Sequence, residues 1–299
     1  MERIETQVTS PTTPAVSLAV REYGDRSADT HVLLVHGFPD DQTMWEPILR
    51  RLPSEWHLIT YDVRGCGDSS RPEGVPAYRT PLLVEDLIAV LDACVPPQEQ
   101  VHLVAHDWGS TGAWEAIAAE TWDPRLEGRI ATYTSASGPS LDHLGTLAST
   151  WRGRLRLLPQ LLHSWYVWLF LVPRLPEIAW NANRRLRPFL RRLDPTIDLL
   201  PWGPQVASNS RYGMNLYRAN VVRQLRAPLA WRTSVPVQLI VATRDPWVLP
   251  VSVAGLEARC RDLTRVEIEA GHWLPRSRPE EFAELVVAFV TARGQRRRA

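Results

Sequence analysis

An apolar run that is typical of a buried strand is followed at once by a short polar turn and a helix around Asp107. The run 101–105 precedes His106-Asp107-Trp108-Gly109-Ser110. A sharp strand-to-helix turn of this kind lifts a nucleophile above a sheet and leaves backbone N–H groups facing an anion. Ala105 and Gly109 stand at the outer glycine positions of the G-x-S-x-G pattern, and Asp107 stands at the nucleophile position. The alternative interpretation makes Asp107 only a helix N-cap.

The second candidate element is the segment Val35-His36-Gly37-Phe38-Pro39-Asp40, at the end of another apolar run. A loop in this position supplies a backbone N–H that, with the N–H of Trp108, forms a pocket for an oxyanion or a leaving group. A plain turn is the alternative. We favour the pocket and predict Phe38 and Trp108 as its donors, because the segment precedes both Tyr61-Asp62-Val63-Arg64-Gly65-Cys66-Gly67-Asp68-Ser69 and the Asp107 turn along the chain.

An acid and a histidine follow two later apolar runs. They lie in Thr243-Arg244-Asp245-Pro246-Trp247 and Ala270-Gly271-His272-Trp273. The order nucleophile, acid, histidine matches one of the known orders of a catalytic triad, and the long gap before Asp245 leaves room for an inserted lid. A lone histidine is usually structural. His272 differs from the other histidines because it follows both a strand-end acid and a nucleophile turn.

The surrounding pattern predicts the elements that hold these loops. Helical stretches at 83–94 and 279–292 alternate with short apolar runs, which predicts an α/β sheet with helices on both faces and a site at the carboxyl ends of its strands. We predict buried parallel strands at 31–35, 56–61, 101–105, 130–134, 237–242 and 264–268. Residues 139–228 differ in composition, with helical patterns broken by proline and 13 Arg against four acids. We therefore expect a core formed by residues 1–138 and 229–299, with a helical lid at 139–228.

Composition narrows the class of protein. The chain has 299 residues and is 44% hydrophobic, with 34 basic side chains, all Arg, against 33 acidic ones. This balance indicates a globular protein with no general attraction to nucleic acid. Three scattered cysteines suggest neither a disulfide framework nor a metal site. No apolar stretch approaches the roughly 18 residues of a membrane span, and the N-terminus has no signal-like apolar region, so we expect a cytoplasmic protein with no transmembrane segment.

Together, the segments HGFPD, DVRGCGDS, AHDWGS, ATRDPWVLP and AGHW resemble the epoxide hydrolases of the α/β-hydrolase superfamily, with haloalkane dehalogenases as near relatives. The resemblance covers nearly the whole chain. It implies the α/β-hydrolase fold, with a mostly parallel central sheet flanked by helices and an inserted helical lid. It also implies that Asp107, Asp245 and His272 form a catalytic triad and that no cofactor is required.

Two lid segments also resemble the family, and they hold its pair of tyrosines. These are Ser164-Trp165-Tyr166 and Met214-Asn215-Leu216-Tyr217-Arg218, where Leu216 departs from the family's N-W-Y-R. The alternative is that both tyrosines are packing residues. The resemblance implies that Asp107 opens the epoxide to an alkyl-enzyme ester while the two phenols donate protons to the ring oxygen. His272 would then activate water, and the product would be a vicinal diol.

The cleft between core and lid is the expected pocket. Its aromatic residues suggest a bulky apolar epoxide, with Phe38, Trp108, Trp165 and Trp273 as candidate substrate-binding residues. Two alternatives remain. One is a haloalkane dehalogenase, although its relatives commonly carry a halide donor where this chain has Phe38. The other is a hydrolase fold that only binds ligands. Fluoroacetate-type dehalogenases are disfavoured because they carry an arginine pair after the nucleophile, where this chain has Trp108 and Thr111.

The lid's positive charge has two interpretations. Five arginines crowd around Pro188, too densely for each to have a nearby carboxylate within the segment: Arg184, Arg185, Arg187, Arg191 and Arg192. They form either a solvated face that pairs partly with the acidic core, or a patch facing an acidic substrate, an acidic carrier protein or an anionic membrane surface. A homodimer also remains open.

Overall fold

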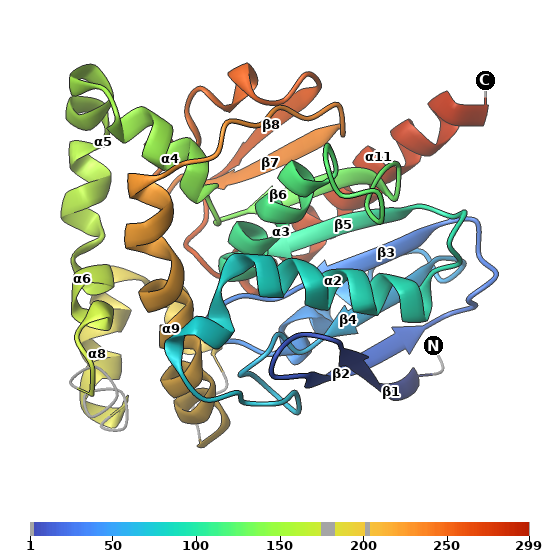
Figure 1. Cartoon of the computed structure of the whole chain (residues 1–299), viewed down its shortest axis with the longest axis horizontal. Coiled ribbons are helices and arrows are strands. Elements are labelled where there is room, and N and C mark those ends of the chain that lie inside the picture. Colours follow the sequence, from blue (N-terminus) through green and yellow to red (C-terminus); the bar gives the residue numbers. More distant parts are fainter. Residues whose placement is uncertain (1–2, 175–182, 201–203, 299) are drawn as a thin grey trace.

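The computed structural model describes residues 3–174, 183–200 and 204–298, with the backbone alone for 183–186 and 294–298. A central sheet carries helices on both faces, and a helical segment lies beyond one edge of this core (Figure 1). Helices α2 (Thr80–Cys94) and α3 (Trp108–Ala119) pack on one face and α11 (Pro279–Arg298) on the other. Each face buries its own apolar cluster, so the sheet is covered on both sides as a parallel sheet requires.

The eight strands lie in the order β1-β2-β4-β3-β5-β6-β7-β8. The strands β4, β3, β5, β6, β7 and β8 are parallel to one another. β2 is antiparallel to both of its neighbours, β1 and β4. The six predicted strands are all present. The strand bounds are β1 Arg3–Ser10, β2 Val16–Tyr23, β3 His31–Val35, β4 His57–Tyr61, β5 Val101–His106, β6 Ile130–Ala136, β7 Val237–Ala242 and β8 Leu263–Ile268.

Two features of the sheet differ from expectation. The sequence pattern did not predict the antiparallel pair β1–β2. β1 is mostly exposed, and Ser17, Arg21 and Glu22 interrupt the apolar residues of β2, so neither strand contains a long apolar run. β8 was expected to be buried, and this is wrong: only Ile268 is fully buried in the strand. β8 pairs with β7 alone and ends the sheet, so its outer residues remain exposed.

Register decides which loops meet at the carboxyl edge of the sheet. Val35, the last residue of β3, lies opposite Ala105 of β5 and opposite Tyr61 of β4. The loops after β3, β4 and β5 therefore emerge side by side. Ala242 lies opposite Ile268, which brings the loops after β7 and β8 together. The candidate loops therefore share one edge of the sheet.

Between β6 and β7 most of the described residues form helices. In Figure 1, α9 lies next to the core, while α5, α6 and α8 lie on its far side. The bounds are α4 Leu141–Ala148, α5 Trp151–His163, α6 Trp165–Leu171, α8 Asn183–Leu193, η3 Pro195–Leu199 and α9 Pro204–Arg226. The short helices of the core are η1 Gln42–Trp45, α1 Glu46–Leu49, η2 Val75–Tyr78, η4 Pro250–Val253, η5 Leu256–Ala258 and α10 Leu274–Ser277.

Candidate active site

Asp107 sits between β5 and α3 in a backbone conformation that few L-residues adopt, with φ 51° and ψ −124°. Its Oδ2 accepts hydrogen bonds from the N–H of Phe38 at 3.2 Å and of Trp108 at 2.7 Å. These are the two donors that the sequence predicted. Because two N–H groups hold Oδ2, the second carboxylate oxygen, Oδ1, remains available on the side of His272.

Two glycines permit this turn through close approach. A Cβ on Gly37 would stand 2.5 Å from the Cβ of Asp107, and one on Gly109 would stand 2.4 Å from the carbonyl oxygens of Val35 and His36. Any side chain at either position would push the loop after β3 away from the Asp107 turn. The absence of a side chain at these positions thus lets the donor of Phe38 reach Asp107.

His272 joins the two carboxylates. Its Nδ1 lies 2.8 Å from Oδ2 of Asp245, and its Nε2 lies 3.6 Å from Oδ1 of Asp107. The other oxygen of Asp245 accepts the N–H groups of Trp247 at 2.8 Å and Val248 at 3.0 Å. Asp245 is therefore held at both oxygens, and it orients the imidazole toward Asp107.

The charges of this cluster shift its pKa values. Burial opposes the charged form of His272, but the charge of Asp245 and hydrogen bonds to Asp107 and Asp245 raise the pKa of the imidazole well above its ordinary value. Burial also opposes ionisation of Asp245, yet the charge of His272 and the hydrogen bonds from His272, Val248 and Trp247 keep its pKa below the ordinary value. These interactions favour the protonated form of His272 and the ionised form of Asp245.

His106 packs against His272. Its Nε2 lies 2.9 Å from the carbonyl oxygen of His272, and the two rings lie 4.9 Å apart between centroids. Burial, followed by the charge of His272, lowers the pKa of His106 to about 4. His106 thus stays neutral and supports the loop that carries His272.

The two predicted tyrosines lie across from Asp107. Tyr166 comes from α6 and Tyr217 from α9, and their ring centroids are 6.2 Å apart. Burial, and then the charge of Asp107, raises the pKa of both phenols above the ordinary value. Both hydroxyls therefore remain protonated beside the carboxylate.

Two apolar cavities meet at these groups. The first, which we call the histidine-side cavity, has a volume of about 100 Å³ and contains His272 in its wall. The second, the Trp108-side cavity, has a volume of about 150 Å³. Asp107, Tyr166, Tyr217 and Trp247 line both. Of the predicted substrate-binding residues, Phe38, Trp165 and Trp273 line the histidine-side cavity and Trp108 lines the other.

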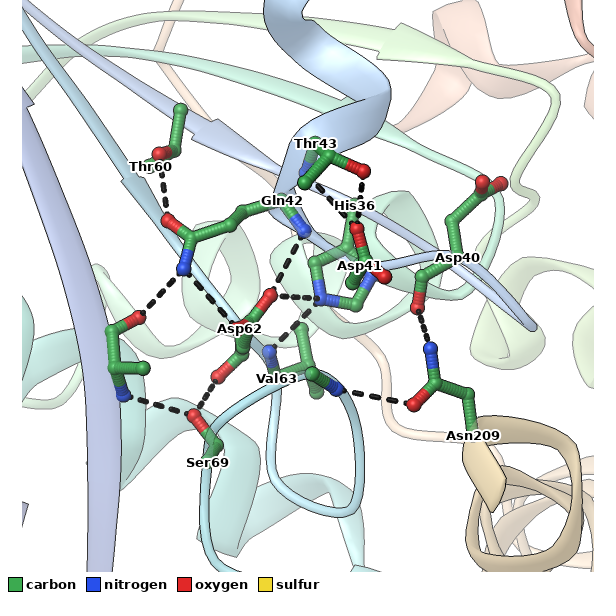
Figure 2. A network of polar contacts seen from close by, with 12 residues as sticks. His36, Asp40, Asp41, Gln42, Thr43, Thr60, Asp62, Val63, Ser69 and Asn209 are labelled. Atoms are coloured by element: carbon green, nitrogen blue, oxygen red, sulfur yellow. Dashed lines mark hydrogen bonds and ion pairs between the residues drawn. The ribbon is translucent and has the colours of Figure 1, made fainter. Parts of the chain in front are cut away.

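A buried polar network fixes the loop that carries Phe38 (Figure 2). Asp62 accepts hydrogen bonds from the backbone N–H of Gln42 at 2.8 Å and from its side chain at 3.0 Å. The N–H of Val63 donates to Nε2 of His36 at 2.9 Å. Asn209 of α9 donates to the carbonyl oxygens of Pro39 and Asp40 at 3.2 and 3.1 Å. The lid therefore holds the donor loop directly.

Two further residues of the inserted helical segment hold the loops that carry His272 and Asp245. Oδ2 of Asp194 accepts the N–H of His272 at 2.9 Å. Gln160 of α5 donates to the carbonyl oxygen of Trp247 and accepts the N–H of Leu249, both at 2.8 Å. Sequence reasoning missed Asn209, Asp194 and Gln160. Each is a single polar residue in a helical or turn segment, and no local pattern distinguishes it from a solvent-exposed one.

The arginine cluster is only partly described. Arg187 and Arg191 share one carboxylate within the segment, that of Asp198, at 2.8 and 2.9 Å. The side chains of Arg184 and Arg185 lie outside the described residues.

With this fold and site, the chain belongs to the alpha/beta hydrolase family, whose model matches residues 32–285. The chain is 34% identical over 287 residues to a "probable oxidoreductase EphD" of Mycobacterium tuberculosis, a match that covers 92% of this chain and 48% of that protein. The chain thus spans about half the length of this relative. It is 29% identical to "epoxide hydrolase A" of M. tuberculosis, over 93% of this chain and 95% of that protein.

Among solved structures, an epoxide hydrolase of Bacillus megaterium in complex with an inhibitor superposes with a TM-score of 0.75. That match has 23% identity and covers 96% of this chain and all of the other. The similarity supports the fold assignment: a mostly parallel eight-stranded sheet with an inserted helical segment.

Proposed function

We propose that the protein is an epoxide hydrolase that converts an apolar epoxide and water to a vicinal diol through an ester on Asp107. The observation that carries this proposal is the asymmetry of the Asp107 carboxylate. Oδ2 is held by the N–H groups of Phe38 and Trp108, whereas Oδ1 has neither donor and lies 3.6 Å from Nε2 of His272. Asp107 lines both cavities. The likeness to epoxide hydrolase A adds support.

The type of nucleophile favours attack at a saturated carbon. A carboxylate that attacks an ester or amide carbonyl would form a reactive anhydride, whereas attack on an epoxide carbon forms an ordinary ester. In the proposed first step, Oδ1 bonds to the epoxide carbon as the carbon–oxygen bond of the ring breaks. Oδ2 becomes the carbonyl oxygen of the ester and stays within reach of the two N–H groups.

The departing ring oxygen needs a proton, and Tyr166 and Tyr217 are the proposed donors. Both line the cavities beside Asp107 with raised pKa values, so each phenol keeps its proton until the ring oxygen becomes more basic. The phenol that gives up its proton is then reprotonated, through water, by protonated His272. Charge is thereby balanced: the carboxylate and the imidazolium are consumed, and a neutral ester and neutral imidazole remain.

Formation of the ester also prepares His272 for the second step. The charge of Asp107 contributes to the raised pKa of His272 in the free site, and formation of the ester removes that charge. The pKa of His272 then falls, and the neutral imidazole can accept a proton from water. The resulting hydroxide adds to the ester carbonyl, and the oxyanion forms at Oδ2, between the N–H groups of Phe38 and Trp108. Cleavage of the acyl–oxygen bond, between the carbonyl carbon and Oδ1, then releases the diol. The departing oxygen takes the proton of the newly formed carboxylic acid, which restores the carboxylate of Asp107 beside the imidazolium of His272.

Isotope labelling tests the covalent route. In a single turnover in water enriched in oxygen-18, the diol should contain no label, because its new oxygen comes from Oδ1 of Asp107. Label should appear in the carboxylate of Asp107 after one turnover and in the diol only after further turnovers. Immediate labelling of the diol would mean direct attack by water and would contradict the proposal.

Asp194 is proposed as a positioning residue for the second step. Asp194→Ala removes the acceptor for the N–H of His272, and displacement of the imidazole by about 1 Å is expected to slow ester hydrolysis by roughly 10²-fold. The fraction of enzyme present as ester at steady state should therefore rise, which rapid quenching and mass spectrometry can measure. Asp198→Asn is the matched control, because Asp198 lies in the same turn but pairs with surface arginines. An unchanged ester fraction in Asp194→Ala would show that Asp194 has no positioning role.

A further inference from the structure

Exposed apolar side chains are concentrated on the outer part of the lid. Among the described residues, all the large exposed hydrophobic side chains except Ile4, Trp122 and Leu229 lie between Trp151 and Leu199. In Figure 1, α5 and α6 follow one another along the edge of the molecule that is farthest from the sheet. A large exposed apolar patch usually marks a surface that binds another molecule or a membrane.

Helix α5 carries this surface as a stripe. Trp151, Leu155, Leu158 and Leu162 recur at intervals of four, three and four residues, so they share one side of the helix. Their exposed fractions are 67%, 63%, 49% and 68%. The opposite side carries the buried residues Gly153, Leu157 and Gln160, which face the rest of the protein. The stripe is therefore an outward face of a well-packed helix.

Arginines flank the stripe on both sides. At about 100° per residue, Arg152 and Arg156 fall on one side of it and Arg154 on the other. The segment 151–172 contains no Asp or Glu. None of the three arginines pairs with a carboxylate in the described part of the chain, and Arg152 lies over the ring of Trp151 at 5.2 Å. The surface thus combines an apolar center with positive margins.

Helix α6 extends the surface to the cavities. Trp165 and Trp168 are 42% and 54% exposed, yet Trp165 also lines the histidine-side cavity and Trp168 the Trp108-side cavity. Arg154 lines the Trp108-side cavity too. A side chain that lines a cavity and is also exposed stands at the edge of that cavity. Both cavities therefore border exposed side chains of α6.

We propose that this surface, the α5–α6 face, binds an anionic phospholipid bilayer, with both cavities bordering the lipid. We define the face by Trp151, Arg152, Arg154, Leu155, Arg156, Leu158, Leu162, Trp165 and Trp168. Amphipathic helices with Trp and Leu on one side and Arg at the margins lie in the bilayer interface, and tryptophan is enriched at this level. None of the described helices combines the length and apolar character that a membrane span requires.

The charge of the α5–α6 face favours an anionic bilayer over a second copy of the chain as its partner. A symmetric dimer through the α5–α6 face would bring the arginines of two copies together without a described acid on the face to compensate them. An anionic lipid surface attracts all three arginines, and its acyl region accepts the tryptophans and leucines. An apolar substrate dissolved in the bilayer would then enter the cavities without crossing water.

Vesicle flotation without any epoxide tests the binding. The wild-type protein should bind vesicles of equal parts phosphatidylglycerol and phosphatidylcholine at least tenfold more tightly than phosphatidylcholine alone. Changing Arg152, Arg154 and Arg156 to Gln should weaken this binding on the order of a hundredfold, since each arginine near an anionic surface contributes about fivefold. Changing three exposed arginines outside the lid, Arg50, Arg232 and Arg261, to Gln is the matched control and should have no comparable effect.

A fluorescent label tests the orientation. The three native cysteines are buried, so a polarity-sensitive dye should label Leu158→Cys selectively. Its emission should shift to the blue on anionic vesicles, whereas the same dye on the exposed control Glu127→Cys should show no shift. Equal binding to neutral and anionic vesicles, equal shifts at both sites, or a dimer that labelling of Leu158→Cys disrupts would overturn the proposal. These measurements do not depend on epoxide turnover, so they fail or succeed separately from the proposed reaction.

Discussion

His272→Gln should accumulate a covalent ester between substrate and Asp107. The variant keeps the nucleophile and the N–H groups of Phe38 and Trp108, so opening of the epoxide should continue. Glutamine cannot accept a proton from water, and loss of a general base typically costs about 10²- to 10⁴-fold. Hydrolysis should slow by at least this factor, and turnover should nearly stop after one equivalent.

Intact-protein mass spectrometry after addition of a styrene-type epoxide measures the adduct, and peptide mapping should locate it on Asp107. The double variant Asp107→Ala, His272→Gln is the control and should show no added mass. Absence of an adduct in a folded His272→Gln variant that still binds substrate would remove His272 from the hydrolytic step, or would show that the first step also needs its charge.

Loss of both lid tyrosines should nearly abolish epoxide opening. Tyr166→Phe and Tyr217→Phe each remove one donor to the ring oxygen, and each should slow formation of the ester by roughly ten- to a thousandfold. Because burial and the charge of Asp107 raise the pKa of both phenols, ionisation of the tyrosines should cause no loss of rate up to pH 10. Rapid-quench measurement of ester formation across pH reports both effects.

Tyr212→Phe is the matched control, since this tyrosine lies on the same helix as Tyr217 but its hydroxyl lies 3.4 Å from Glu73. A haloalkane offers a second comparison because a departing halide needs no proton, so any haloalkane turnover should survive the tyrosine changes. If both single variants form the ester at the wild-type rate, the tyrosines are packing residues, and dehalogenase activity becomes the better hypothesis.

The sequence alone predicted the elements whose determinants are local. Short runs rich in β-branched and aromatic residues indicated all six parallel strands, and the polar residues just after three of them indicated where Asp107, Asp245 and His272 would lie. In a parallel sheet the carboxyl ends of the strands lie at one edge, so order along the chain was enough to group the three loops. The antiparallel strands β1 and β2 could not be predicted in this way, because their alternating pattern is weaker.

Only the tertiary structure decided how these loops are held and which surfaces stay exposed. Asn209, Asp194 and Gln160 act through hydrogen bonds to backbone groups far away in the chain, and a single buried amide or carboxylate has no sequence pattern of its own. The apolar stripe of α5 has the same spacing as a helix packed into a core. The stripe is exposed because no other element of the described structure packs against it. Long-range packing decides this, and the local sequence does not.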